Sequence, residues 1–303
     1  MALQPEIWVA QLVENFYKDN EFMQHATPHD EFVLEGKVVH LAQAGSPSGV
    51  SVNRTSLPAT ISERTDTETT YVIDELTSDP VLIRNIDVIQ LSYDKRQSII
   101  SNDMANIKEK GAENLLSRWV ANLNANNIIR TTGAARSSAI TGATGNRKAF
   151  DKSTMFAMKV KFDKDKVPAA NRKCLLYPDQ IDALLQDKDL AVNFVKYADL
   201  AAGIVGRVAG FDIFMRDTVL RFSNDATPVV KSPSSVVATD ENAGALFWHP
   251  SCVARAMGDV KMFERLNDPT MYGDVYSFLL MFGGRGLRAD GKGIGAVVEA
   301  ASA

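Results

Sequence analysis

The sequence predicts a protein of the α+β class. Three observations support this: a helix of about 25 residues with a single apolar stripe, a Ser/Thr-rich stretch punctuated by Gly and Pro, and a second half in which strands and helices alternate irregularly. The 303 residues are 45% apolar and 23% charged, which is typical of a globular protein with one large or two medium domains.

The composition excludes several classes of protein. The 33 basic and 37 acidic residues leave a formal charge of -4, so the whole chain is not a basic nucleic-acid binder. Cys174 and Cys252 are too few and too far apart for a disulfide framework or a thiolate zinc site, and we expect two buried thiols in a reducing compartment. The first residues, MALQPEIWVAQ, lack the basic start of a signal peptide, and no stretch has the roughly 18–20 apolar residues of a membrane span. We therefore expect a soluble protein without a membrane partner.

Charge is distributed unevenly along the chain. Residues 1–75 contain 12 acidic and 4 basic residues, whereas residues 126–173 contain 11 basic and 3 acidic residues. Regions of opposite charge can pair within one chain or between copies of it, and complementary patches also steer association. The near-neutral total therefore conceals two regions that could attract each other.

The amino-terminal quarter predicts an arm and a long hairpin. Residues 2–35 indicate a short amphipathic helix, with Ile7, Leu12, Val13 and Phe16 on its apolar side, followed by an extended segment. Residues 42–80 contain 13 Ser or Thr residues and eight large apolar ones, which favours a long hairpin or extended loop. Because ordering a residue costs about 1–2 kcal/mol, so few apolar side chains cannot hold this segment alone. It must lie along a surface of the rest of the fold or of another subunit.

A strand and a long helix follow. Residues 80–91 predict a strand. The helix is capped by one of residues 101–103 and extends to about Asn126, and its stripe consists of Ile100, Met104, Ile107, Leu115, Trp119 and Leu123. Residues 131–154 are small and polar and predict a connection rather than core.

The remaining chain predicts short alternating elements. We expect strands at residues 173–177, around Gly206 and Gly210, and at residues 276–282 and 293–298. We expect helices at residues 178–185 and 190–198, and another after Pro250.

No catalytic, cofactor or metal motif fits its context. Residues 140–148, ITGATGNRK, resemble a dinucleotide-binding turn, but no buried strand precedes them and Lys148 replaces the third glycine. The glycines of residues 284–295 have no phosphate-loop spacing and indicate turns. His25 and His29 have the spacing of a helical metal pair, yet Pro28 lies between them. We therefore expect no enzyme, no cofactor and no metal.

Four ordered segments carry a resemblance to a known family. They are CLLYPDQIDALL (174–185), AGIVGRVAGFDIF (202–214), ALFWHPSCVARAM (245–257), and YGD (272–274) with FGGRGLRADG (282–291). The chain resembles tailed-bacteriophage major capsid proteins of the Hong Kong 97-like fold, and looks closest to podovirus coat proteins. Two segments depart from the family pattern, residues 216–220 after the second strand and Ala289 in place of a proline.

The resemblance implies a division of the chain. It implies an N-terminal arm (1–35), an extended loop (36–79), a peripheral domain with a long spine helix (80–154), an axial domain (155–265), and strands that return to the peripheral domain (266–303). In the family pattern, ALFWHPSCVARAM is a strand followed by an alanine-rich helix.

The resemblance also implies a function and partners. The chain would self-assemble through hexamers and pentamers into the icosahedral head shell of the virion, in the host bacterial cytoplasm, with separate scaffolding and portal proteins and non-specific contact to packaged double-stranded DNA. The acidic loop would then face the basic tract of a neighbouring subunit, and the candidate contact residues are Arg54, Glu63, Arg64, Asp66, Glu68, Asp74, Glu75, Arg147 and Lys148.

Three other interpretations stay open at this point. One is an encapsulin-like nanocompartment shell with the same fold. Another is a nucleotide-dependent oxidoreductase that uses residues 140–148. The third is a monomeric binding module.

Overall fold

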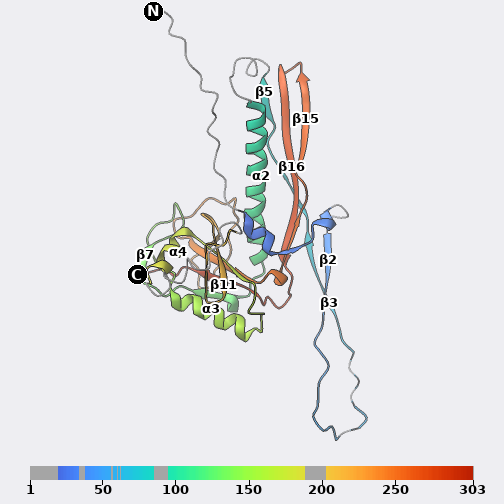
Figure 1. Ribbon diagram of the computed structural model, residues 1–303, viewed down its shortest axis with the longest axis vertical. Helices are drawn as coiled ribbons and strands as arrows, with labels where there is room; N and C mark the ends of the chain where they lie inside the picture. The colour runs from blue at the N-terminus through green and yellow to red at the C-terminus, as the bar shows by residue number, and fades with distance from the viewer. Residues whose placement is uncertain are drawn as a thin grey trace, which may run out of the picture.

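The computed structural model describes residues 20–33, 38–84 apart from 56, 60 and 62, 95–187 and 203–302. The predicted helices at residues 7–16 and 190–198, and most of the strand predicted at 80–91, lie outside the described residues. Two main sheets organise the chain, an elongated sheet next to α2 and a compact sheet beside α3 and α4 (Figure 1). The predicted α+β class is confirmed.

The elongated sheet is built around one long strand, β16 (Gly273–Gly286). Strands β14 (Val253–Met257) and β15 (Lys261–Asp268) pair antiparallel along one edge of β16, and β4 (Asp74–Thr77) and β5 (Val81–Arg84) pair along the other. The short β1 (Thr27–Pro28) adds parallel to β14.

Helix α2 (Lys95–Val120) packs along β16 with the predicted apolar stripe. Ile107, Leu115 and Trp119 are buried, so the long helix is confirmed, although it begins and ends about six residues earlier than predicted. A short 3-10 helix, η3 (Ala125–Asn127), follows, and the Asn124 side chain caps it by accepting a hydrogen bond from the Asn126 N–H. Glycines let helix and strand approach closely, because a Cβ on Gly284 would lie 2.4 Å from the Leu115 Cδ1.

The compact sheet has seven strands, and its path runs β10-β11-β9-β13-β17-β6, with β12 beside β13. Its strands are β6 (Ile128–Arg130), β9 (Arg172–Leu176), β10 (Gly206–Val208), β11 (Phe211–Met215), β12 (Leu220–Phe222), β13 (Asn242–Trp248) and β17 (Ile294–Val298). Every residue of β9, β13 and β17 is buried, because alternate side chains enter two cores. One core includes the end of α2, and the other includes α3 (Lys152–Lys164) and α4 (Pro178–Leu185).

Two small hairpins complete the described chain. Strands β2 (Val38–Gln43) and β3 (Thr67–Val72) form the base of the predicted long hairpin, and β7 (Ala135–Ser137) pairs with β8 (Asn146–Lys148). The β7–β8 region is more than a connection, since Ile140 and Phe150 are buried in the two cores.

The segment after Pro250 corrects the prediction of a helix there. A single 3-10 turn, η6 (Pro250–Cys252), leads directly into β14. The backbone of β14 pairs with β16, and the Ala254 carbonyl also accepts a hydrogen bond from the Trp119 Nε1–H at 2.9 Å. The small side chains of Ala254 and Ala256 pack against Val33, Val39, Tyr71 and Ile73. Tertiary contacts therefore override helix propensity here.

The two sheets divide the chain differently from the predicted ranges. Strand β14 and most of β15 lie within the range 155–265 but belong to the elongated sheet, whereas β6, within 80–154, and β17, within 266–303, belong to the compact sheet. The reason is that β17, Ile-Gly-Ala-Val-Val, is buried throughout and pairs with the central strand β13.

A segment near the N-terminus ties the two sheets together. The 3-10 helices η1 (Glu21–His25) and η2 (Asp30–Val33) flank β1, and Phe22 packs edge-on against both Trp119 and Trp248. The Trp248 Nε1–H donates to the His25 carbonyl at 2.8 Å, and the Asp30 carboxylate accepts from Arg255 at 2.8 Å. One short stretch thus contacts the compact sheet, α2 and the elongated sheet.

Candidate subunit interface

The base of the β2–β3 hairpin is fixed to the rest of the chain. The Gln43 side chain donates to the Leu287 carbonyl at 2.7 Å, and Arg285 donates to the Thr70 carbonyl at 2.6 Å. Tyr71 is buried, its hydroxyl lies 3.0 Å from the His29 Nδ1, and burial raises the pKa of Tyr71 to about 12. The hairpin therefore leaves the body of the protein at a defined place.

Beyond this base, residues 44–66 form a loop that projects away from both sheets (Figure 1). No strand lies in its described part, between the end of β2 and the start of β3. Four apolar side chains, which we call the loop tip, are 93%, 88%, 82% and 97% exposed; they are Val50, Val52, Leu57 and Ile61. Among the described residues, no apolar burial of these four side chains offsets the cost of ordering the loop. The loop tip is therefore the part of the described chain that a neighbour would have to cover.

Asp66 of the loop and Glu68 of β3 are paired within the chain. Arg64 binds the Asp66 carboxylate through two nitrogens, at 2.7 and 2.8 Å, and the Gly45 N–H donates to it at 2.9 Å. The bonds from Arg64 and then Gly45 lower the pKa of Asp66 below its usual value. Glu68 contacts His40 on the opposite strand of the hairpin.

At the hairpin base, Asp74 forms an ion pair with Arg118 of α2. Arg118 also donates to the Val72 carbonyl at 3.0 Å and lies over the Phe282 ring. Three of the predicted acidic contacts thus have partners in the same subunit, and the predicted candidates Arg54, Glu63 and Glu75 are exposed.

The predicted basic candidates lie in two different environments. Arg147 is only 6% exposed, and its guanidinium donates to the Asn242 side chain at 2.6 Å and to the Glu241 carbonyl at 3.4 Å. It is therefore an internal residue. Lys148, the next residue of β8, is exposed.

Several basic residues of the tract form ion pairs inside the subunit. Ion pairs join Arg136 to Asp179 and Asp182, Lys152 to Asp187, Lys161 to Asp165, Arg172 to Asp163, and Lys173 to Asp212. The Lys173–Asp212 pair is buried, with a distance of 2.8 Å between its charged atoms. The sequence alone did not show that part of this positive charge is already compensated.

A groove lies between the carboxyl end of α2 and the segment that follows β12. It has a volume of about 470 Å³, and its lining includes Leu123, Ile128, Phe222, Pro228, Val229 and Val230. Arg118 and Lys231 also line it, Lys231 is exposed, and Val229 is 60% exposed. We refer below to this site as the groove and to residues 227–232 as its wall.

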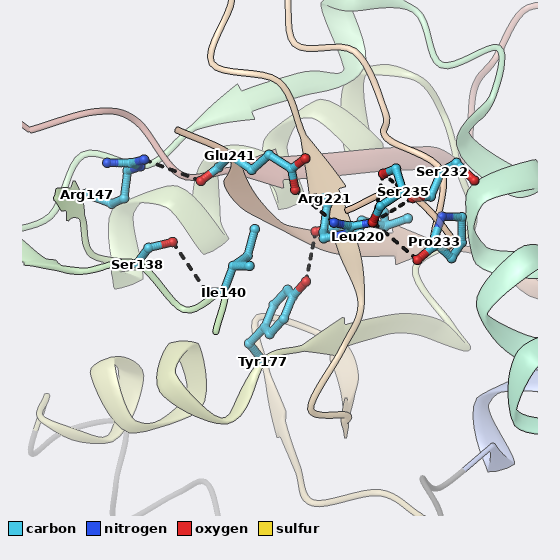
Figure 2. Close-up of polar contacts among 10 residues, drawn as sticks. All are labelled: Ser138, Ile140, Arg147, Tyr177, Leu220, Arg221, Ser232, Pro233, Ser235 and Glu241. Atoms are coloured by element: carbon cyan, nitrogen blue, oxygen red, sulfur yellow. Dashed lines mark hydrogen bonds and ion pairs between the residues drawn. The ribbon is translucent and has the colours of Figure 1, made fainter. Parts of the chain in front are cut away.

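Polar contacts hold the wall in place. Figure 2 shows the Arg221 guanidinium between Glu241 and the chain at residues 232–235. It donates to the Glu241 carboxylate at 3.1 Å and to the carbonyls of Ser232, Pro233 and Ser235 at 2.6, 3.2 and 2.8 Å. The backbone adds bonds from the Ser223 N–H to the Val229 carbonyl and from the Lys231 N–H to the Arg221 carbonyl. The Tyr177 hydroxyl donates to the Leu220 carbonyl at 3.0 Å and fixes β12 beneath the wall (Figure 2).

The far end of the elongated sheet carries further exposed apolar groups. They lie on β15 and on the turn to β16, and are Met262, Phe263, Leu266, Met271 and Tyr272. The turn is fixed by Asp268, whose carboxylate accepts from the Thr270 N–H at 2.8 Å. The site residues that sequence reasoning missed are therefore apolar ones, and their exposure depends on tertiary structure rather than on a motif.

The histidines and cysteines do not gather. His25 lies against the Phe214 ring, whereas His29 contacts Tyr71, and in the described part of the chain no three His, Cys, Asp or Glu side chains are placed to hold a metal. Cys174 and Cys252 are buried free thiols, as predicted. The described residues also contain no helix that is long and apolar enough to cross a membrane.

The structure resembles solved capsid structures along almost its whole length. The capsid of Ralstonia phage GP4 superposes with a TM-score of 0.72 at 13% identity, over 99% of this chain and 96% of the other. The capsid of cyanophage P-SCSP1u gives 0.69 at 20% identity, over 99% and 93%, and a structure from Mycobacterium phage Che8 gives 0.64 at 19% identity, over 98% and 97%. The sequence matches no protein-family model and no curated protein. The chain has the tailed-phage capsid fold, so the predicted Hong Kong 97-like fold is confirmed.

Proposed function

We propose that this chain is the major capsid protein of a tailed bacteriophage and self-assembles into the icosahedral head shell that encloses the phage DNA. One observation carries the proposal: residues 44–66 project from a fixed base, and their four large apolar side chains are more than 80% exposed. A loop of this kind is stable only when another surface covers it. The fold shared with phage capsids makes a second copy of this chain the natural source of that surface.

The geometry supports heterologous contacts. The projecting loop and the groove are different surfaces of one chain, so each copy would give its loop to one neighbour and receive a loop from another. Contacts of this kind close into rings, and we propose hexamers and pentamers. In this arrangement the elongated sheet with α2 is the peripheral domain, and the compact sheet with α3 and α4 is the axial domain.

The remaining partners follow from the same proposal. We propose a virion location, assembly in the host cytoplasm with separate scaffolding and portal proteins, and non-specific contact with packaged DNA through phosphates. Among the predicted contact residues, we retain Arg54, Glu63, Glu75 and Lys148 as subunit contacts because they are exposed. Arg147 is not retained because it is buried.

Electron microscopy of the purified protein tests the function. The chain is produced with and without the neighbouring phage assembly genes, separated by sedimentation and imaged, and we expect closed shells. A matched variant replaces residues 46–64 by a short Gly-Ser turn between the fixed ends of the hairpin, and it should stay folded but yield no shells. A wild-type chain that sediments only as a small species under all these conditions would reject the proposal.

A further inference from the structure

The loop tip and the groove have complementary properties. We propose that the groove between α2 and the wall binds the loop tip of a second copy of this chain. This inference rests on the proposed function and assigns the place where the neighbouring loop docks. It also changes the nature of the contact from the predicted pairing of acidic and basic regions to apolar insertion.

The loop of the same subunit cannot fill the groove. The loop begins at the β2–β3 base and extends away from α2 and from the compact sheet (Figure 1). The groove lies at the carboxyl end of α2, between Leu123, Phe222 and Val229. Occupation therefore requires a loop supplied by another copy.

The two surfaces match in polarity. Leu123, Ile128 and Phe222 contribute apolar surface to the groove, and all four side chains of the loop tip are exposed to water in the free subunit. Contact would remove apolar area from water on both sides, which is the main driving force of association. Asp66 already has a partner within the loop, and Glu68 has one across the hairpin base, so the four apolar side chains of the loop tip are the larger exposed surface that a neighbour can cover.

One charge pair would fix the orientation of the inserted loop. Glu63 lies two positions after Ile61 in the sequence and is exposed. An extended backbone in the docked loop would point both side chains to the same side. Lys231 is exposed and lies in the lining of the groove. With Ile61 between α2 and the wall, Glu63 is placed to meet Lys231 at the edge.

The wall is formed before any partner arrives. Arg221 holds residues 232–235 through three backbone carbonyls and is itself held by the buried Glu241 (Figure 2). A surface fixed in this way loses little conformational freedom on binding. The groove is thus a preorganised receptor, whereas the loop gains its order from docking.

Disulfide trapping in assembled shells tests the docking directly. The native thiols, Cys174 and Cys252, are buried, so introduced cysteines on the surface report the contact. We pair Ile61→Cys with Val229→Cys in the wall, and the matched control pairs Ile61→Cys with Val236→Cys. Val236 is 93% exposed, belongs to the segment between β12 and β13, and does not line the groove. Shells are treated with oxidised glutathione and analysed by non-reducing electrophoresis.

We expect intersubunit cross-links in the Ile61→Cys/Val229→Cys shells, at least about tenfold above the control pair, because docking raises the effective concentration of the two thiols. Shells in which the control pair cross-links equally, or in which neither pair cross-links, would overturn the docking site and leave the capsid function intact. A wild-type chain that forms no shells would instead reject the proposed function, and the docking site with it.

A second variant checks the polarity of the contact. Ile61→Asp places a charge at a side chain that is 97% exposed in the free subunit, so the fold should not change. We expect a loss of shell yield of about tenfold or more, because each weak contact is repeated around the shell. The control Val236→Asp should assemble as the wild type does, and equal yields from the two variants would contradict apolar insertion.

Discussion

The central strand of the compact sheet and the projecting loop differ in what stabilises them, although they belong to one chain. All seven residues of β13 are buried between two cores, and its neighbours β9, β12 and β17 come from the same subunit. The loop tip has no comparable cover. The compact sheet is therefore complete within a single subunit, whereas the loop becomes stable only in an assembly.

The ion pairs of the two regions differ in the same way. In the compact sheet, Lys173–Asp212 and Arg221–Glu241 are buried pairs with additional hydrogen bonds. In the hairpin, Arg64–Asp66 and His40–Glu68 are exposed pairs that join nearby parts of the hairpin itself. Buried pairs are sensitive to the loss of one partner, while exposed pairs are worth little. Substitutions in the compact sheet should thus change folding, and substitutions in the loop should change assembly.

The largest expected effect on folding is at Arg221. Arg221→Ala leaves the Glu241 carboxylate buried without its cation and removes the bonds to the carbonyls of Ser232, Pro233 and Ser235. We expect the free energy of unfolding to fall by about 3–5 kcal/mol, as measured by urea denaturation. The control Arg54→Ala removes an exposed side chain of the loop and should change it by less than about 0.5 kcal/mol. Equal losses from the two variants would contradict the role given to Arg221.

A smaller effect is expected at Tyr177. Tyr177→Phe removes only the hydroxyl that donates to the Leu220 carbonyl. The residue is buried, so we expect a loss of about 1 kcal/mol in the free energy of unfolding. An unchanged midpoint of thermal unfolding would show that β12 does not depend on this bond.

Asp290, close to the hairpin base, should stabilise the fold by less than the Tyr177 hydroxyl does, and only above acidic pH. Hydrogen bonds from Arg288 are the main cause that lowers the pKa of Asp290 to about 2. Since the folded pKa lies below the ordinary value of 3.8, the contribution is complete above pH 3.8 and is lost as the pH falls toward 2. The side chain is 38% exposed, so solvent screening limits the contribution to less than about 1 kcal/mol. Denaturation curves of wild type and Asp290→Asn should differ at pH 5 and converge at pH 2, and a constant difference would refute this assignment.

The fold was predictable wherever local periodicity agreed with tertiary packing. The stripe of α2 has helical spacing over six turns, and the Tyr177-Pro178 junction marks both the end of β9 and the start of α4. The failure came after Pro250, where Ala254 and Ala256 suggest a helix. They pack against Val33, Val39, Tyr71 and Ile73 from η2 and the hairpin base, and that long-range contact has no local signature.

The sequence predicted where the subunit contact lies along the chain, but not which of its residues are free to make it. The sequence located the loop and its need for a partner surface, yet it could not reveal that Asp66 and Glu68 are already paired, because Glu68 meets His40 only through the register of β2 and β3. The groove was also hidden, since Leu123 and Phe222 are about a hundred residues apart in the chain. Long-range pairing of this kind leaves no pattern within a sequence window.

The smallest expected effect on folding, and the sharpest test of the comparison, is in the loop tip. Replacing Val50, Val52, Leu57 and Ile61 together by Ser removes only exposed side chains, so the free energy of unfolding of the isolated chain should change by less than about 0.5 kcal/mol. The same variant should form no closed shells by electron microscopy, because it removes every large apolar side chain described on the loop tip. A clear loss of stability in the isolated chain would mean that the loop packs on its own subunit. Both regions would then be stabilised within one subunit, and the comparison would fail.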